Sequence, residues 1–325
     1  PLNPNLWSPG VKWGVTAGTV THLTEFFGPV LGVMRFERLE EAIDLVNATG
    51  YGLTSGLASL DEREHEIWKA RIRAGNLYID RGTTGAIVLR QPFGGWGQSS
   101  VGPGFKAGGP NYLVPLLSLR PRATEADLLA GLVSGELLEL EAGLAQEASL
   151  DDAIRRRLAS AFRSYEAAWR QEFARDQDHF RLLGQDNIRR YRGWSAVRVR
   201  VTPDDSAFDL FARVAAVRLT GARAVISTPE EFDSPALALL DRVTSLWGAC
   251  VEFLEESDDQ LTEWLESLPP HADERLSYAA PDRVPAMLRR VAAAAGRFIA
   301  DEGLLGVGRV DLLWFLREQK LSWDY

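Results

Sequence analysis

The stretch Arg81-Gly-Thr-Thr-Gly-Ala-Ile-Val-Leu-Arg-Gln-Pro-Phe-Gly-Gly95 is the part of this chain that says most about its fold. It opens a segment rich in glycine and proline that runs to Gly109 and has the composition of a long loop. Long loops inside domains usually have a function. The small residues at Thr84-Gly85-Ala86 leave backbone N–H groups free to approach an anion closely. A plain surface loop containing a buried Phe93 is the alternative that the residues alone leave open.

Short strands and two helices surround this loop. Residues 30–36 and 76–80 read as strands, because both are apolar runs of strand length. Residues 39–47 carry apolar side chains at helical spacing, and residues 61–73 read as a second helix. Asp61 is the expected N-cap of that second helix, and acidic residues follow in its first turn.

The middle of the chain is predicted to be helical. Residues 122–185 contain few helix breakers, and Thr124 is a plausible N-cap with acidic residues close behind it. Between residues 155 and 180, large apolar side chains recur every three or four positions, at Leu158, Phe162, Tyr165, Trp169 and Phe173. We therefore expect residues 121–193 to form a helical connector.

A different rhythm begins near Trp194, where strand-like and helix-like segments alternate. The expected strands cover residues 197–201, 222–227, 249–254, 275–279 and 297–300, and the expected helices cover residues 206–219, 235–247, 258–268 and 284–295. This alternation predicts an α/β fold with a parallel sheet, crossover helices and Rossmann-like layers. Thr202-Pro-Asp-Asp205 stands where a glycine fingerprint would be needed, so we expect no dinucleotide to bind there.

Bulk properties narrow the classes of function. The chain has 325 residues, a net charge of −9 and a single cysteine. The charge argues against a nucleic-acid partner held through its phosphates, and no apolar run approaches the roughly 18 residues of a membrane span. Cys250 lies in an apolar stretch that predicts an inert, packed thiol, and one cysteine fits a reducing cytoplasm. No pair among the four histidines has metal-ligand spacing.

Glu25 and Phe27 are the other candidate pair. If the backbone is extended, side chains two residues apart point to the same side. A carboxylate suits the hydroxyl pair of a ribose, and an aromatic ring suits the face of a nicotinamide. The alternative is a solvated glutamate beside a core phenylalanine.

Several motifs together resemble the C-terminal part of an aldehyde dehydrogenase catalytic domain, over roughly residues 1–120. They are the loop motif, Leu6-Trp-Ser-Pro-Gly-Val-Lys-Trp13, Thr24-Glu-Phe-Phe-Gly-Pro29 and Gly75-Asn-Leu-Tyr-Ile79. The subtype that they most resemble oxidises glutamate semialdehyde to glutamate in proline breakdown, with NAD as cofactor.

The resemblance assigns roles to residues. It implies that Glu25 holds the nicotinamide ribose and that Phe27 lines the nicotinamide pocket. It implies that the backbone amides of Gly85 and Ala86 anchor the substrate carboxylate, with Phe93 against the aliphatic part of the substrate. Residues 112–119 would form the strand of an oligomerisation flap, which suggests a homo-oligomer.

The catalytic cysteine of the family has no counterpart among these motifs, so we expect it upstream of Pro1, in a longer polypeptide. Asp186-Asn-Ile-Arg-Arg-Tyr-Arg192 and Phe315-Leu-Arg-Glu-Gln319 resemble the tail of long bifunctional proline-utilisation enzymes. Those enzymes add a proline dehydrogenase, and with it FAD, and end in a noncatalytic domain that residues 194–325 would match. A noncatalytic assembly or binding module that keeps the scaffold is the second hypothesis.

Overall fold

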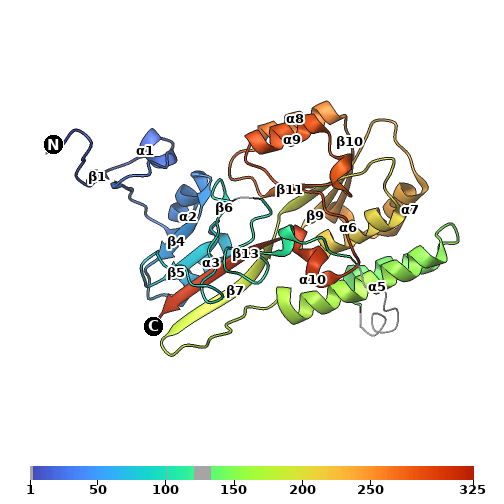
Figure 1. Ribbon diagram of the computed structural model, residues 1–325, viewed down its shortest axis with the longest axis horizontal. Coiled ribbons are helices and arrows are strands. Elements are labelled where there is room, and N and C mark those ends of the chain that lie inside the picture. The colour runs from blue at the N-terminus through green and yellow to red at the C-terminus, as the bar shows by residue number, and fades with distance from the viewer. Residues whose placement is uncertain (1–2, 101, 121–132) are drawn as a thin grey trace.

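The computed structural model describes residues 3–100, 102–120 and 133–325. Figure 1 shows an elongated molecule, with a small unit of β1 (Gly10–Trp13) and α1 (Val20–Leu23) at one end and an α/β domain (residues 194–315) at the other. Two long strands, β7 (Gln185–Gly193) and β13 (Leu316–Asp324), run between these ends. Over the described ranges, no helix is both long and apolar enough to cross a membrane.

The α/β domain is built on a five-stranded sheet whose strands are all parallel, in the order β10-β9-β8-β11-β12. The strands are β8 (Ala196–Arg200), β9 (Arg223–Thr228), β10 (Val251–Glu255), β11 (Glu274–Ser277) and β12 (Ile299–Ala300). The helices are α6 (Ala207–Leu219), α7 (Pro235–Thr244), α8 (Asp258–Ser267), α9 (Ala286–Ala294) and α10 (Gly308–Asp311). Side chains of β8 and β9 are buried on both faces, as parallel strands covered by helices require. The predicted α/β fold is confirmed.

Helices α4 (Gly135–Ala145) and α5 (Asp152–Ala168) cover one side of this domain, and a π-helical turn (Trp169–Phe173) continues α5. The Asp151 carboxylate caps α5 by accepting the N–H groups of Ala153 and Ile154. The predicted apolar stripe faces inward, since Leu158, Phe162, Tyr165 and Phe173 are all buried in the main core. The predicted cap at Thr124 lies outside the described residues.

The first part of the chain holds small sheets. They comprise the parallel pair β1 (Gly10–Trp13) and β2 (Val30–Val33), the antiparallel pair β3 (Tyr51–Gly52) and β6 (Trp96–Gly97), and the neighbours β4 (Thr54–Leu57) and β5 (Asn76–Ile79). Its helices are α1 (Val20–Leu23), α2 (Leu39–Ala48) and α3 (Glu62–Arg71). Asp61 caps α3 by accepting the N–H of Arg63 at 2.9 Å, as the sequence predicted.

The end of the chain completes a sheet in its first part. Strand β13 (Leu316–Asp324) pairs in parallel with β5 and antiparallel with β7 (Gln185–Gly193), which gives the sheet order β4-β5-β13-β7. Leu321 of β13 packs into a small core with Ile43, Trp68 and Leu77. Residues 194–325 therefore divide between the α/β domain and a strand that belongs to the other part of the molecule.

Two expected elements are wrong. The predicted helical connector (residues 121–193) ends in strand β7, because residues 185–193 pair with β13, which is distant in the sequence. Residues 112–119 do not form the predicted flap strand, because Val114–Leu116 is a turn of 3-10 helix with proline in its first turn. Proline removes a backbone donor that a strand ladder needs. The expectation of a homo-oligomer relied on that strand and stays a prediction.

Candidate functional site

The loop that follows β5 (residues 80–94, the anchor loop) carries three of the predicted site residues. Strand β5 is buried along its whole length, so it fixes the point where the loop begins. The Tyr78 hydroxyl donates to the Gly85 carbonyl at 3.1 Å, which ties the tip of the loop to that strand. Burial raises the pKa of the Tyr78 hydroxyl, so it remains a proton donor at neutral pH.

Gly85 and Ala86 lie exposed at the tip of this loop. Gly85 has a φ of +121°, a backbone conformation that residues with a side chain rarely adopt. Within the described part of the chain, neither the Gly85 nor the Ala86 amide donates a hydrogen bond. Two adjacent free N–H groups in an open turn can donate hydrogen bonds to an anion such as a carboxylate.

Contacts from distant parts of the chain hold the anchor loop in place. Within the loop, the Ile87 and Gln91 backbones form an antiparallel bridge, at 3.0 Å and 2.7 Å. The Gln91 amide donates to Asn187 Oδ1 of β7 at 2.9 Å. At its start, Arg81 forms an ion pair with Asp324 of β13 at 3.1 Å. Asn187 and Asp324 thus support the site from the sheet, and sequence reasoning did not single them out for that purpose.

Phe93 lies near the end of the anchor loop and is half-buried. Its backbone forms an antiparallel bridge with Ala107, whose two hydrogen bonds measure 3.0 Å and 2.9 Å. The second half of the glycine-rich segment therefore folds back on the first. Phe93 is only partly buried, as a residue that contacts a ligand requires.

Glu25 and Phe27 lie in the other predicted site, just after α1. They line a cavity of about 380 Å³ together with Thr21, Thr24 and Gly28. Phe27 is 91% exposed and has a positive φ of 45°, which is uncommon for a bulky residue. The His22 ring contacts the Leu45 carbonyl at 2.8 Å and so ties α1 to α2.

The structure groups the candidates into two sets. Glu25 and Phe27 share one cavity, and Gly85, Ala86 and Phe93 share one loop. Among the described residues, no hydrogen bond or ion pair joins the two sets. Each set presents exposed groups of the predicted chemistry, a carboxylate with a ring in the first and free amides in the second.

Cys250 lies far along the chain from both sets. It is the last residue of a 3-10 turn (Ser245–Cys250), immediately before β10, rather than inside the strand as predicted. Its thiol is half-buried and packs against the main core of the α/β domain.

Known proteins are similar to this chain in sequence over its first part and in structure over nearly all of it. Residues 2–119 match the aldehyde dehydrogenase family. Over 100 residues the chain is 55% identical to the bifunctional protein PutA of Rhizobium meliloti, an alignment that covers 30% of this chain and 8% of that protein. Over 90 residues it is 43% identical to the 1-pyrroline-5-carboxylate dehydrogenase of Geobacillus sp. (strain WCH70), covering 28% of this chain and 17% of that enzyme.

A solved structure matches nearly the whole chain. Proline utilization A (PutA) from Corynebacterium freiburgense superimposes with a TM-score of 0.75 and 34% identity, covering 98% of this chain and 28% of that protein. The chain therefore spans a small part of the length of the relatives that it matches. The likeness extends beyond the aldehyde dehydrogenase match and takes in the α/β domain.

Proposed function

We propose that this chain supplies the C-terminal part of an NAD-dependent aldehyde dehydrogenase that oxidises L-glutamate γ-semialdehyde to L-glutamate in proline catabolism. The observation that carries the proposal is the exposed Gly85–Ala86 turn, whose two amides donate no hydrogen bond within the described residues. The substrate of this reaction carries a carboxylate at the end opposite its aldehyde. An anchor made of backbone amides would bind that carboxylate and set the distance to the reacting carbon.

Glu25 and Phe27 would hold the nicotinamide end of the cofactor. The Glu25 carboxylate lies exposed in the cavity after α1, where it can accept hydrogen bonds from a ribose, and the exposed Phe27 ring lies beside it. NAD, when bound, accepts the hydride that leaves the substrate. FAD enters the proposal only if a proline dehydrogenase half shares the polypeptide.

The nucleophile belongs, in this proposal, to residues outside this chain. Cys250 is the only cysteine, and it lies half-buried in the α/β domain. The pair β1–β2 supports the same idea, because a two-stranded parallel sheet is not stable alone and exposes Trp13 and Val30. Further strands would cover it in the complete enzyme. We therefore expect this chain alone not to catalyse the reaction. We also propose that the complete enzyme is cytoplasmic.

The anchor is tested by Gly85→Val in a complete dehydrogenase that carries this sequence. A side chain at a φ of +121° strains the turn and crowds its amides, so we expect the KM for the semialdehyde to rise about tenfold or more, with a smaller change in kcat. Gly221→Val is the matched control, because Gly221 also has a positive φ, of 84°, but lies in the α/β domain with open space around it. An unchanged KM in the Gly85 variant would refute the anchor.

A further inference from the structure

We propose that the cleft between the first part of the chain and the α/β domain binds a small multivalent anion, a phosphate or a polycarboxylate, through Arg73, Arg275 and Arg317. This site is separate from the anchor loop and from the Glu25 cavity. The inference does not depend on the proposed function.

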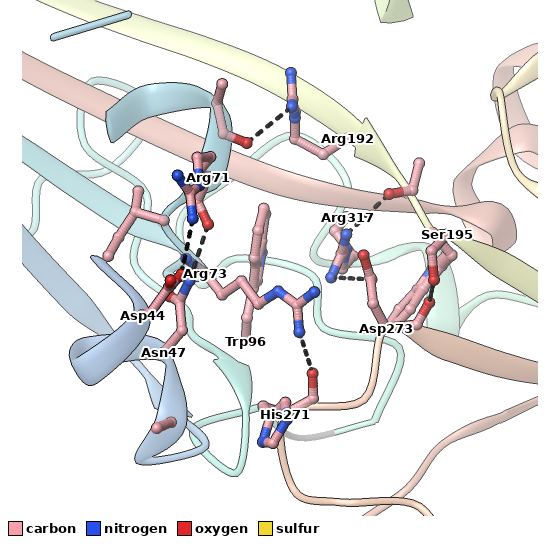
Figure 2. Close-up of a pocket in the computed structure, with 15 residues that line it drawn as sticks. Asp44, Asn47, Arg71, Arg73, Trp96, Arg192, Ser195, His271, Asp273 and Arg317 are labelled. Carbon is pink, nitrogen blue, oxygen red and sulfur yellow. Dashed lines mark hydrogen bonds and ion pairs between the residues drawn. The ribbon is translucent and has the colours of Figure 1, made fainter. Parts of the chain in front are cut away.

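Two adjoining cavities of about 600 Å³ and 760 Å³ form the cleft. Both are lined by Arg73, Trp96, Trp194, His271 and Arg317. Arg73 follows α3, Trp96 lies in β6, Arg317 lies in β13, and His271 precedes β11. Figure 2 shows the Arg73 side chain extending across the space towards His271. Both parts of the molecule therefore contribute to the walls.

The charge of this lining differs in sign from that of the whole protein. Six arginines and four carboxylates line the two cavities, so the cleft has a formal excess of positive charge in a chain of net charge −9. Two ion pairs lie within this lining, Asp44 with Arg71 at 2.9 Å and Asp273 with Arg317 at 2.6 Å. Among the described residues, four of the lining arginines and two of the carboxylates remain outside ion pairs, so the excess of positive charge is unchanged. An anion is attracted to such a concave positive surface.

Arg275 is the strongest single observation behind an anion site. It is only 5% exposed, and across the described residues it forms no ion pair. Its guanidinium donates to two backbone carbonyls, Trp314 O at 2.8 Å and Pro103 O at 3.3 Å. Burial and the nearby Arg317 lower the pKa of Arg275 to about 9. A buried charge without a counter-charge is costly, and a bound anion would offset that cost.

Arg317 and Arg275 are held rigidly for this purpose. Their guanidinium groups lie over the Trp194 ring, at 4.4 Å and 4.3 Å from its centroid, and Arg317 also lies 4.4 Å from the centroid of Trp96. These cation–π contacts fix two positive groups beside the cleft before any ligand arrives.

Arg73 is the accessible member of the set. It is half-buried, lines both cavities, and donates to the His271 carbonyl. Within the described residues it has no carboxylate partner. Planar guanidinium groups bind phosphate and carboxylate oxygens in bidentate fashion, which favours a compact ligand with several anionic oxygens.

The test is calorimetric titration of the full chain with inorganic phosphate and, separately, with citrate, at constant ionic strength set by chloride. We expect saturable binding of at least one of the two, and the stronger one identifies the ligand class. Arg73→Gln and Arg275→Gln should each weaken that binding about tenfold or more, because each removes a charged hydrogen-bond donor. Arg63→Gln is the matched control, since its side chain is 88% exposed, pairs with Asp61 and lies outside the cleft lining.

The proposal is overturned if neither anion binds saturably, or if Arg73→Gln binds as tightly as the unaltered chain. Loss of binding in Arg63→Gln equal to that in Arg73→Gln would also overturn it, because the effect would then come from net charge alone. Circular dichroism establishes that each variant is folded. If Arg275→Gln does not fold, the half-buried Arg73 decides the question.

Discussion

Replacing Leu321 by alanine should loosen the sheet from which the anchor loop starts. Leu321 is 1% exposed and lies in the centre of β13, opposite Leu77 of β5 and Ile188 of β7. With Ile43 and Trp68 it closes the small core of the first part of the chain. No other residue of β13 belongs to the fully buried part of that core.

The expected size follows from that burial. Leu→Ala substitutions at fully buried positions cost about 2–5 kcal/mol, because transfer free energy is lost and a cavity remains. A cost of about 3 kcal/mol makes local opening of the sheet about 100-fold more frequent. The α/β domain has a separate core, so its strands should not open more often.

Hydrogen exchange followed by mass spectrometry measures both regions in one experiment. We expect amides of β5 to exchange about 100-fold faster in Leu321→Ala, while amides of β9 keep the rate of the unaltered chain. Tyr325→Ala is the control, since its side chain is 72% exposed beyond the end of β13. Unchanged protection in β5, or an equal loss in β5 and β9, would refute the view that β13 is an integral strand of this sheet.

Three further predictions concern single residues. A Cβ on Gly75 would lie 2.0 Å from the Gly94 carbonyl oxygen, so Gly75→Ala should lower the free energy of unfolding by about 2–3 kcal/mol. Gly10 has open space around it, so Gly10→Ala should leave the free energy of unfolding unchanged. Urea unfolding of both variants measures the difference. Burial lowers the pKa of Lys320 to about 7, so the unfolded chain binds more protons between pH 7 and about 10. Stability should therefore rise with pH across that window, and Lys320→Met should make the rise shallower between urea midpoints at pH 7 and pH 9. Cys250→Ala should change the kcat of a complete dehydrogenase by no more than about twofold relative to the unaltered enzyme. Loss of activity would instead identify Cys250 as the nucleophile.

Local sequence signals predicted most of the α/β domain. Strands β8 to β12 and helices α6 to α9 lie within a few residues of the predicted positions, because apolar periodicity alone marks each of them. Asp61 was also predicted correctly as the N-cap of α3. The prediction of a flap strand was wrong for a reason that the sequence contains, because Pro115 interrupts the apolar run.

Strands β7 and β13 could not be predicted in the same way. Their pairing joins residues more than 120 positions apart, and β13 lacks a clean apolar alternation. Its buried residues include Glu318, Gln319 and Lys320, whose side chains form hydrogen bonds with residues far away in the sequence. Without those partners in view, such a sequence looks like an exposed segment.

The same distance limits what the sequence says about the site. The chemistry of Gly85 and Ala86 can be inferred from small residues and a familiar motif, and those residues do lie in an exposed turn. The supports of that turn, Asn187 and Asp324, belong to strands whose location emerges only from the fold. No local signal in the sequence marks either residue as part of a site.

Polar pairing fixes the register of β13 and, through it, the geometry of the anchor loop. Trp96 Nε1 donates to the Glu318 carbonyl at 2.9 Å, Gln319 donates to the Ala74 carbonyl at 2.8 Å, and the Lys320 N–H donates to the Gly75 carbonyl at 2.8 Å. A slip by one residue would turn every side chain to the other face and leave buried charges without partners.

The observed register is also the one that brings Asp324 to Arg81, at the start of the anchor loop. On the other side of β13, the same register sets Ser322 opposite Asn187, which accepts the hydrogen bond from the Gln91 side-chain amide. A polar strand is therefore suited to this position, because an apolar strand could shift along the sheet at less cost and carry these two supports out of place. The far end of the chain thus determines where the exposed amides of Gly85 and Ala86 lie.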